Sequence, residues 1–144
     1  MDSKKLPLII NIGLTKRELH ISFKKYIHEL SIDIPFENFG LLFLADFKED
    51  LTQQDIADYM KKDKSAILRQ IDNLEEKGLV KRVVDSQDRR RNILTITDKG
   101  KDFIKEIVEI EKKLFVDLQK DISSQDMDTF NRVLLQLRNN SEKI

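Results

Sequence analysis

The sequence predicts a mainly α-helical protein with one small β-hairpin, and three observations support that prediction. Only four Gly and two Pro occur in 144 residues, and 36% of the residues are charged, which is typical of a helix-rich chain. Apolar residues recur at helical spacing along most of the sequence. The exception is the segment 79–97, where two short β-branched or alternating runs flank a polar loop.

Length and composition limit the class of protein. A chain of 144 residues with 40% hydrophobic residues is expected to form one compact domain with its own core. Because the chain has no cysteine, it has no disulfide, no thiolate metal ligand and no thiol redox sensor. No stretch approaches the roughly 20 apolar residues that cross a bilayer. The apolar run Leu6–Leu14 lacks a signal-peptide cleavage site, so we expect a cytoplasmic protein without a membrane partner.

The first helix is predicted to run from about Ile9 to Ser31, because apolar residues recur there at near-helical spacing. Pro35 breaks the pattern, since a proline moves the residue before it out of the helical region. A second, short helix is marked by the apolar residues between Phe39 and Phe47.

Two helices joined by a tight turn follow. Thr52 is predicted to cap the first of them, with Asp55 three positions later, and Asp63 is predicted to cap the second. Gly78 stands where a helix ends on a left-handed residue. Helices of about 8 and 14 residues with a short connection form a helix-turn-helix.

The next segment predicts a hairpin with a basic tip. Residues 79–84 and 92–97 are the expected strands, and the loop between them contains three consecutive arginines: Arg89, Arg90 and Arg91. We expect Asp85 to stabilise the base of this hairpin and Asp88 to hold the Arg90 side chain. A hairpin directly after a helix-turn-helix makes a winged helix, with the hairpin as its wing.

Two more helices complete the predicted fold. Apolar residues from Phe103 to Ile122 form one long stripe, and Ser123 is predicted to cap a last helix that extends past Leu137. The stripe is wider than a small winged helix can cover, so we expect a second copy of the chain to cover it, with packing of three helices within one chain as the alternative. Within a single domain of residues 1–144, the expected regions are a helical dimerisation region, residues 1–34 and 101–144, and a winged helix-turn-helix DNA-binding region, residues 35–100.

Charge is unevenly distributed although the net charge is zero. Residues 61–91 carry 10 basic and 6 acidic side chains, whereas residues 1–60 carry 7 and 10. A basic middle flanked by acidic ends is typical of a module that binds a polyanion. Charge alone does not separate this interpretation from a solvated surface, but the helix-turn-helix at the same place favours the polyanion.

The second helix of the helix-turn-helix has the dimensions to enter the major groove of DNA. The expected DNA-binding residues are Lys62, Lys64, Ser65, Ala66, Arg69 and Gln70, followed by the wing arginines Arg89, Arg90 and Arg91. Arg69 is suited to guanine and Gln70 to adenine. A guanidinium on an exposed hairpin is suited to a narrow minor groove.

Four segments form one specific combination: Asp63-Lys64-Ser65, Leu74-Glu75-Glu76-Lys77-Gly78-Leu79-Val80, Asp85-x-x-Asp88-Arg89-Arg90, and Leu94-Thr95-Ile96-Thr97-Asp98-Lys99-Gly100. This combination resembles the MarR family of multiple-antibiotic-resistance-type regulators. The resemblance implies a homodimer on a pseudo-palindromic operator in double-stranded DNA, which represses or activates transcription and is modulated by a small ligand. Of the two we expect a repressor, with a small aromatic or phenolic compound as the effector. It also implies a wing pair of Asp88 with Arg90, with Arg90 in the minor groove. Arg91 departs from the small residue usual at its position.

Two alternatives remain beside this interpretation. A winged helix also serves as a protein-interaction module without an operator, which is the alternative function. Phe39, Phe43 and Phe47 either pack in the core or line an effector pocket.

His20 and His28 lie about 12 Å apart if both are on one helix, too far to share a metal ion. With no phosphate-binding glycine loop, Gly-x-Ser-x-Gly or His-Glu-x-x-His motif, we expect no enzyme activity, catalytic residue, cofactor or metal.

Overall fold

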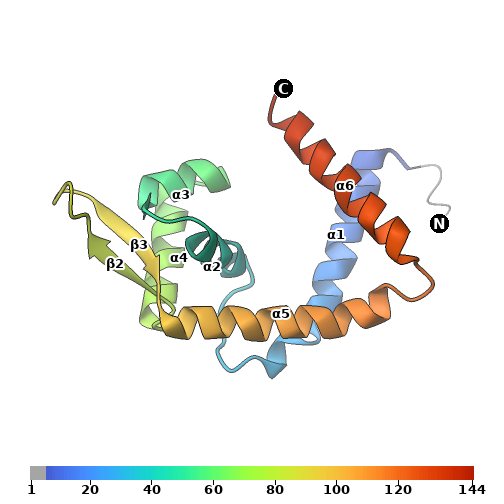
Figure 1. Cartoon of the computed structure of the whole chain (residues 1–144), viewed down its shortest axis with the longest axis horizontal. Coiled ribbons are helices and arrows are strands. Elements are labelled where there is room, and N and C mark those ends of the chain that lie inside the picture. Colours follow the sequence, from blue (N-terminus) through green and yellow to red (C-terminus); the bar gives the residue numbers. More distant parts are fainter. Residues whose placement is uncertain (1–5) are drawn as a thin grey trace. The chain divides into compact units, whose positions relative to one another are not determined.

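A computed structural model of the chain describes residues 6–144 (Figure 1). Its helices and strands are α1 (Leu8–Lys24), the 3₁₀ turn η2 (Ile27–Glu29), α2 (Glu37–Phe47), β1 (Leu51–Thr52), α3 (Gln53–Met60), α4 (Lys64–Glu76), β2 (Val80–Val84), β3 (Asn92–Ile96), α5 (Asp98–Leu118) and α6 (Ser124–Ser141). The mainly helical class with one small sheet is confirmed. The chain divides into two compact units within α5, one reaching Ile110 and the other Glu111–Ile144. The first five residues of the predicted dimerisation region lie outside the described residues.

The core of the first unit is built from helix faces that the apolar spacing predicts. Its fully buried side chains come from α2, α3, α4, the start of β2 and α5, and the largest are Phe103, Leu41, Leu42, Ile56, Ile67, Ile71, Leu74, Leu79 and Val80. Each buried aliphatic or aromatic side chain of this size contributes about 1.5–3 kcal/mol to folding. These residues fix α3 and α4 against α2 and the sheet.

Side-chain caps set where α3 and α4 begin, as predicted. The Thr52 hydroxyl accepts the Asp55 N–H at 3.2 Å, and the Asp55 carboxylate accepts the Thr52 N–H at 2.9 Å, so a complete capping box starts α3. Asp63 accepts the N–H groups of the second and third residues of α4. The turn between the two helices passes through Lys61, whose φ of 50° is left-handed.

The sheet has three antiparallel strands in the order β1-β3-β2, one more than the sequence predicts. The predicted hairpin is formed by β2 and β3, which pair from Val80 with Ile96 to Val84 with Asn92. The additional strand is β1, in which Leu51 pairs with Leu94. Two residues are too few to show the alternation that identifies a strand. Because β1 leads directly into α3, this pairing joins the helix-turn-helix to the wing.

The wing returns to α5 through a tight junction. The Thr97 hydroxyl donates to the Gly78 carbonyl at 2.6 Å and accepts the Gly100 N–H at 3.0 Å, so Thr97 caps the start of α5. Gly78 has a φ of 73°, which confirms its predicted place at the end of α4. A Cβ added to Gly100 would lie 2.1 Å from the Leu79 carbonyl oxygen, so no larger residue fits there.

Two predicted helix ends are wrong. α1 was expected to reach Ser31 but ends at Lys24, and a tighter turn follows in which the Tyr26 N–H donates to the Phe23 carbonyl at 2.9 Å. This tightening lets Phe23 and Ile27 both pack against the core. The apolar stripe predicted to reach Ile122 also overruns its helix, because α5 ends at Leu118.

The helices at the two ends of the chain leave apolar side chains uncovered. Neither α1 nor α6 contains a buried residue. The large hydrophobic side chains exposed on α1 are Leu8, Ile9, Ile10, Ile12, Leu19 and Ile21, and those on α6 are Phe130, Val133, Leu134, Leu135 and Leu137. No helix among residues 6–144 has the length and apolar character needed to cross a membrane.

Candidate nucleic-acid interface

The outward face of α4 carries four of the nine residues predicted to contact DNA. Lys64, Ser65 and Arg69 are exposed, and Ala66 is half-buried. Leu68 lies among them and is 40% exposed. The face therefore offers two cations, a hydroxyl and an apolar group.

Gln70, expected on this outward face, is buried instead, with only 5% of its surface exposed. Its side-chain nitrogen donates to the Glu37 carbonyl at 3.4 Å, while its Oε1 is buried without a partner among residues 6–144. The cause is helical geometry, because position 70 shares the inward face with Ile67 and Leu74. The sequence analysis placed Gln70 on the outward face because its side chain is polar.

A shallow hollow of about 410 Å³ lies beside α4. Its lining residues are Pro35, Glu37, Asn38, Lys62, Ala66, Arg69, Gln70 and Asn73. Asn38 is buried and donates from Nδ2 to the Asn73 Oδ1 at 2.8 Å, which fixes the start of α2 on α4. This pair was not predictable from the sequence, since two asparagines 35 residues apart form no recognisable pattern.

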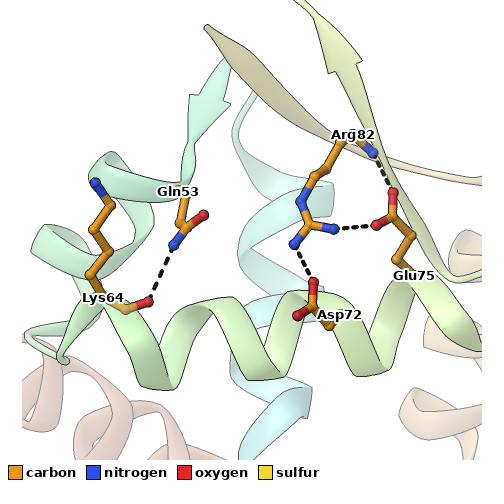
Figure 2. Close-up of polar contacts among 5 residues, drawn as sticks. All are labelled: Gln53, Lys64, Asp72, Glu75 and Arg82. Atoms are coloured by element: carbon orange, nitrogen blue, oxygen red, sulfur yellow. Dashed lines mark hydrogen bonds and ion pairs between the residues drawn. The ribbon is translucent and has the colours of Figure 1, made fainter.

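The N-terminus of α4 is already occupied by a carboxylate. Hydrogen bonds from the backbone N–H groups of Ser65 and Ala66 lower the pKa of Asp63. A phosphate at this helix end would therefore depend on Lys62 and Lys64 more than on free N–H groups. Gln53 was not predicted as part of this region, but its Nε2 donates to the Lys64 carbonyl at 3.3 Å (Figure 2).

The wing is stabilised at its base by Asp85 and near its tip by Asp88. Asp85 is buried, accepts the Gln87 N–H at 2.8 Å, and lies 3.6 Å from the Arg91 guanidinium. Asp88 was predicted to hold the Arg90 side chain, and this prediction is wrong. Asp88 instead accepts the backbone N–H of Arg90 at 2.9 Å, so it holds the loop through the main chain.

The three wing arginines are therefore not equivalent. Arg91 pairs with the buried Asp85, and its charge also helps to lower the pKa of Asp55, after the larger effect of the Thr52 hydrogen bonds. Arg89 and Arg90 are exposed and have no ion pair within the described part of the chain. Of the three wing arginines, these two are the ones available to a partner.

Arg82 is a part of this region that the sequence reasoning missed. Its guanidinium forms ion pairs with Asp72, at 2.5 Å, and with Glu75, and its backbone N–H donates to Glu75 at 3.0 Å (Figure 2). Burial lowers the pKa of Arg82, but the hydrogen bond and charge of Asp72 and the charge of Glu75 outweigh it and raise the pKa. The signal in the sequence was the pair of acids three residues apart on one helix, followed by a basic residue in the adjoining strand.

The predicted aromatic residues divide into two groups. Phe39 is buried, whereas Phe43 and Phe47 are exposed, so the three line neither a common pocket nor a common core. His20 stacks on Phe36 with the ring centroids 4.0 Å apart, and its Nε2 is buried without a partner among the described residues. The described residues contain no group of three side chains able to hold a metal ion.

Comparisons with known proteins agree with this geometry. Residues 40–91 match the model of the MarR family. The HTH-type transcriptional regulator YdgJ of Bacillus subtilis (strain 168) is 26% identical over 104 residues, which cover 72% of this chain but only 63% of that relative. A crystal structure of MarR shares the fold with a TM-score of 0.80 and 22% identity, over 96% of this chain and 100% of that one. A variant of S. aureus MepR bound to an oligodeoxyribonucleotide shares it with a TM-score of 0.64 and 22% identity, over 94% and 99%.

Proposed function

We propose that the chain is a MarR-family regulator: a dimeric, sequence-specific DNA-binding transcriptional regulator that acts as a repressor modulated by a small-molecule effector, in line with the family match over residues 40–91. Its relatives in the family are transcriptional regulators and not enzymes. The observation that carries the proposal is that Arg89 and Arg90 are exposed and form no ion pair among the described residues, on a wing joined to a helix-turn-helix whose helix α4 exposes Lys64 and Arg69. Like charges on a hairpin tip repel each other, so their placement is better explained by a polyanionic partner than by stability.

In this proposal α4 lies in the major groove and the wing in an adjoining minor groove. Arg69 reads a base edge, Lys62 and Lys64 bind phosphates, and Leu68 or Ala66 contacts a thymine methyl group. Arg89 and Arg90 are the candidates for the minor groove, because Arg91 is held by Asp85 at the wing base. The MepR variant bound to an oligodeoxyribonucleotide supports the proposal, since it has the same fold.

The dimer is supported by the uncovered apolar side chains of α1 and α6. Apolar side chains exposed in such number on each helix are usually covered by a partner, and identical subunits pair about a two-fold axis. Such a dimer presents two copies of α4 to half-sites one helical turn apart, about 34–36 Å, on a pseudo-palindromic operator.

The region we propose for the effector is the contact between α1 and the segment before α2, where His20 stacks on Phe36. Phe23 and Phe39 extend this aromatic cluster, with ring centroids 5.9 Å apart. A buried imidazole nitrogen without a partner is suited to a hydrogen-bonding group on a small aromatic acid or phenol. Thermal-shift screening of such compounds tests this part, and a hit that His20→Leu retains at full strength would place the effector elsewhere.

The function is tested by selecting a duplex from a random library with wild-type protein and measuring its affinity by fluorescence anisotropy. We expect Arg69→Ala to cost about 1–3 kcal/mol per half-site and to relax preference at one base pair. Arg90→Ala is expected to weaken binding to all duplexes, with a salt slope smaller by about 0.9 per lost phosphate contact.

Lys105→Ala is the matched control, because Lys105 is an exposed cation of α5 that pairs with Asp102 and lies outside the proposed interface. It is expected to bind like wild type. If Arg69→Ala and Arg90→Ala both bind like Lys105→Ala, the DNA-reading assignment is wrong, and the winged helix is better explained as a protein-interaction module.

A further inference from the structure

The helix proposed to enter the major groove carries more acids than bases. Lys64 and Arg69 are its two basic residues, whereas Asp72, Glu75 and Glu76 are acidic. The acids lie in its second half, where Asp72 and Glu76 are exposed and Glu75 is half-buried. A duplex carries one phosphate charge per about 1.7 Å of its axis, so unscreened carboxylates at this surface would oppose binding.

The outward direction of these acids follows from the buried face of α4. Ile67, Ile71 and Leu74 point into the core. Residues spaced by three or four share a helix side, so Asp72 lies on the same side as Leu68 and Glu75. Since Leu68 is exposed on the outward face of α4, Asp72 and Glu75 place their carboxylates on that face as well.

One guanidinium binds both of these carboxylates. Arg82 is on β2, and its two terminal nitrogens contact Asp72 and Glu75 separately, as Figure 2 shows. The Arg82 side chain is only 27% exposed, against 56% for Asp72. Its N–H groups are therefore directed at α4 and away from solvent, and Glu75 is further fixed by the Arg82 backbone N–H.

We propose that Arg82 is a positioning residue for DNA recognition: it masks the charges of Asp72 and Glu75, and so lets the outward face of α4 approach the phosphates. The inference rests on the proposed DNA-binding function and adds a residue to it. Arg82 acts through the two acids and does not itself bind a phosphate. The preceding residue on the same strand, Lys81, is exposed and pairs with neither acid.

The size of the effect follows from Coulomb's law. A carboxylate and a phosphate about 4 Å apart repel each other by about 1 kcal/mol even in bulk water, and more near a protein surface. One such repulsion in each of the two subunits of a dimer then corresponds to a loss of about 10- to 100-fold in affinity. The loss is expected to shrink at high salt, because screening weakens the repulsion.

The test compares wild type with Arg82→Met, which keeps the length of the aliphatic chain and removes the charge, and with the triple variant Arg82→Met/Asp72→Asn/Glu75→Gln. Affinity for the duplex selected by wild type is measured by anisotropy from low to high salt. We expect Arg82→Met to bind about 10- to 100-fold more weakly at low salt. The triple variant is expected to recover most of the affinity, because neutral amides need no masking. Lys81→Met removes one positive charge at the neighbouring position and is expected to lose little.

Each outcome decides between distinct ideas. If wild type binds a duplex and Arg82→Met binds equally well, this inference is wrong while the proposed function stands. If the amide pair restores nothing, Arg82 contacts DNA directly or has only a structural role, and the masking proposal is again overturned. Should wild type select no duplex at all, the proposed function fails and the inference fails with it. Should Arg82→Met not fold, the pair Asp72→Asn/Glu75→Gln beside an intact Arg82 decides: masking predicts equal or tighter binding, and weaker binding contradicts it.

Discussion

At the scale of single residues, side-chain chemistry was a less reliable guide than helical position. The caps at Thr52, Asp63 and Ser123 were predictable, because each signal is local and consists of a hydroxyl or carboxylate followed by free N–H groups. Gln70 was misplaced because a polar residue on an inward position needs a tertiary partner, here the Glu37 carbonyl, which no local pattern reveals. For the same reason the sequence could not show that Arg91 pairs with Asp85.

A methyl group added at Gly100 should lower the stability of the fold. In Gly100→Ala the new Cβ would overlap the Leu79 carbonyl oxygen, which belongs to the backbone and cannot turn away. We expect a loss of at least about 1–3 kcal/mol in the free energy of unfolding, measured by urea titration. Gly40→Ala is the control, because its Cβ would meet only Met60 Cε at an ordinary 3.6 Å, and it should stabilise α2 by about 0.5–1 kcal/mol. Equal stabilities for the two variants would contradict the tight junction.

Asp63 should make part of the stability dependent on acid. Backbone hydrogen bonds from Ser65 and Ala66 lower its pKa in the folded state. The stabilisation is therefore complete above the unfolded pKa of about 3.9 and is lost as the pH falls through the lower folded value. We expect Asp63→Asn, which retains a good cap, to show a smaller drop in Tm between neutral pH and about pH 3.

The control for this pH series is Asp33→Asn, since the exposed Asp33 side chain makes no hydrogen bond among residues 6–144. Its Tm should fall with acid as steeply as that of wild type. A drop for Asp63→Asn as steep as that of the control variant would show that the cap does not carry this part of the acid dependence.

At the scale of elements, the fold was largely predictable and its exceptions share one cause. The helix-turn-helix, the hairpin and the long helix were found because apolar periodicity and turn residues are local signals. β1 and the early end of α1 depend instead on distant partners: β1 pairs with β3, and Phe23 after the middle of α1 packs against the core. Sequence spacing is silent on such partners.

The wing should depend on its base more than on its tip. Asp85→Ala removes the acceptor of the Gln87 N–H and the partner of Arg91, so we expect faster amide hydrogen exchange across residues 84–92 and weaker DNA binding. Asp88→Ala removes a single exposed acceptor near the tip and is expected to change exchange only locally. Mass spectrometry of peptides from both variants measures the difference. Equal protection in the two variants would show that Asp85 does not hold the wing.

At the scale of the whole molecule, the terminal helices should decide the oligomeric state. Leu134 is exposed on α6, and a charge there would be buried without a partner in the proposed dimer. We expect Leu134→Glu to sediment or scatter light as a monomer of 17.0 kDa, while wild type has twice that mass. Phe47→Glu is the control, because Phe47 is at least as exposed but lies on α2, and it should remain dimeric. A monomeric wild type at micromolar concentration would contradict the dimer itself.

The two-residue strand β1 has a consequence for the DNA that such a protein could accept. Its pairing with β3 joins the start of the helix-turn-helix to the wing. The proposed major-groove helix α4 and the proposed minor-groove wing are therefore expected to keep a fixed separation. One inserted base pair lengthens a duplex by about 3.4 Å and rotates it. We therefore expect an insertion inside a half-site, between the bases contacted by α4 and by the wing, to abolish one of these two contacts. A fixed separation between α4 and the wing cannot follow the longer duplex.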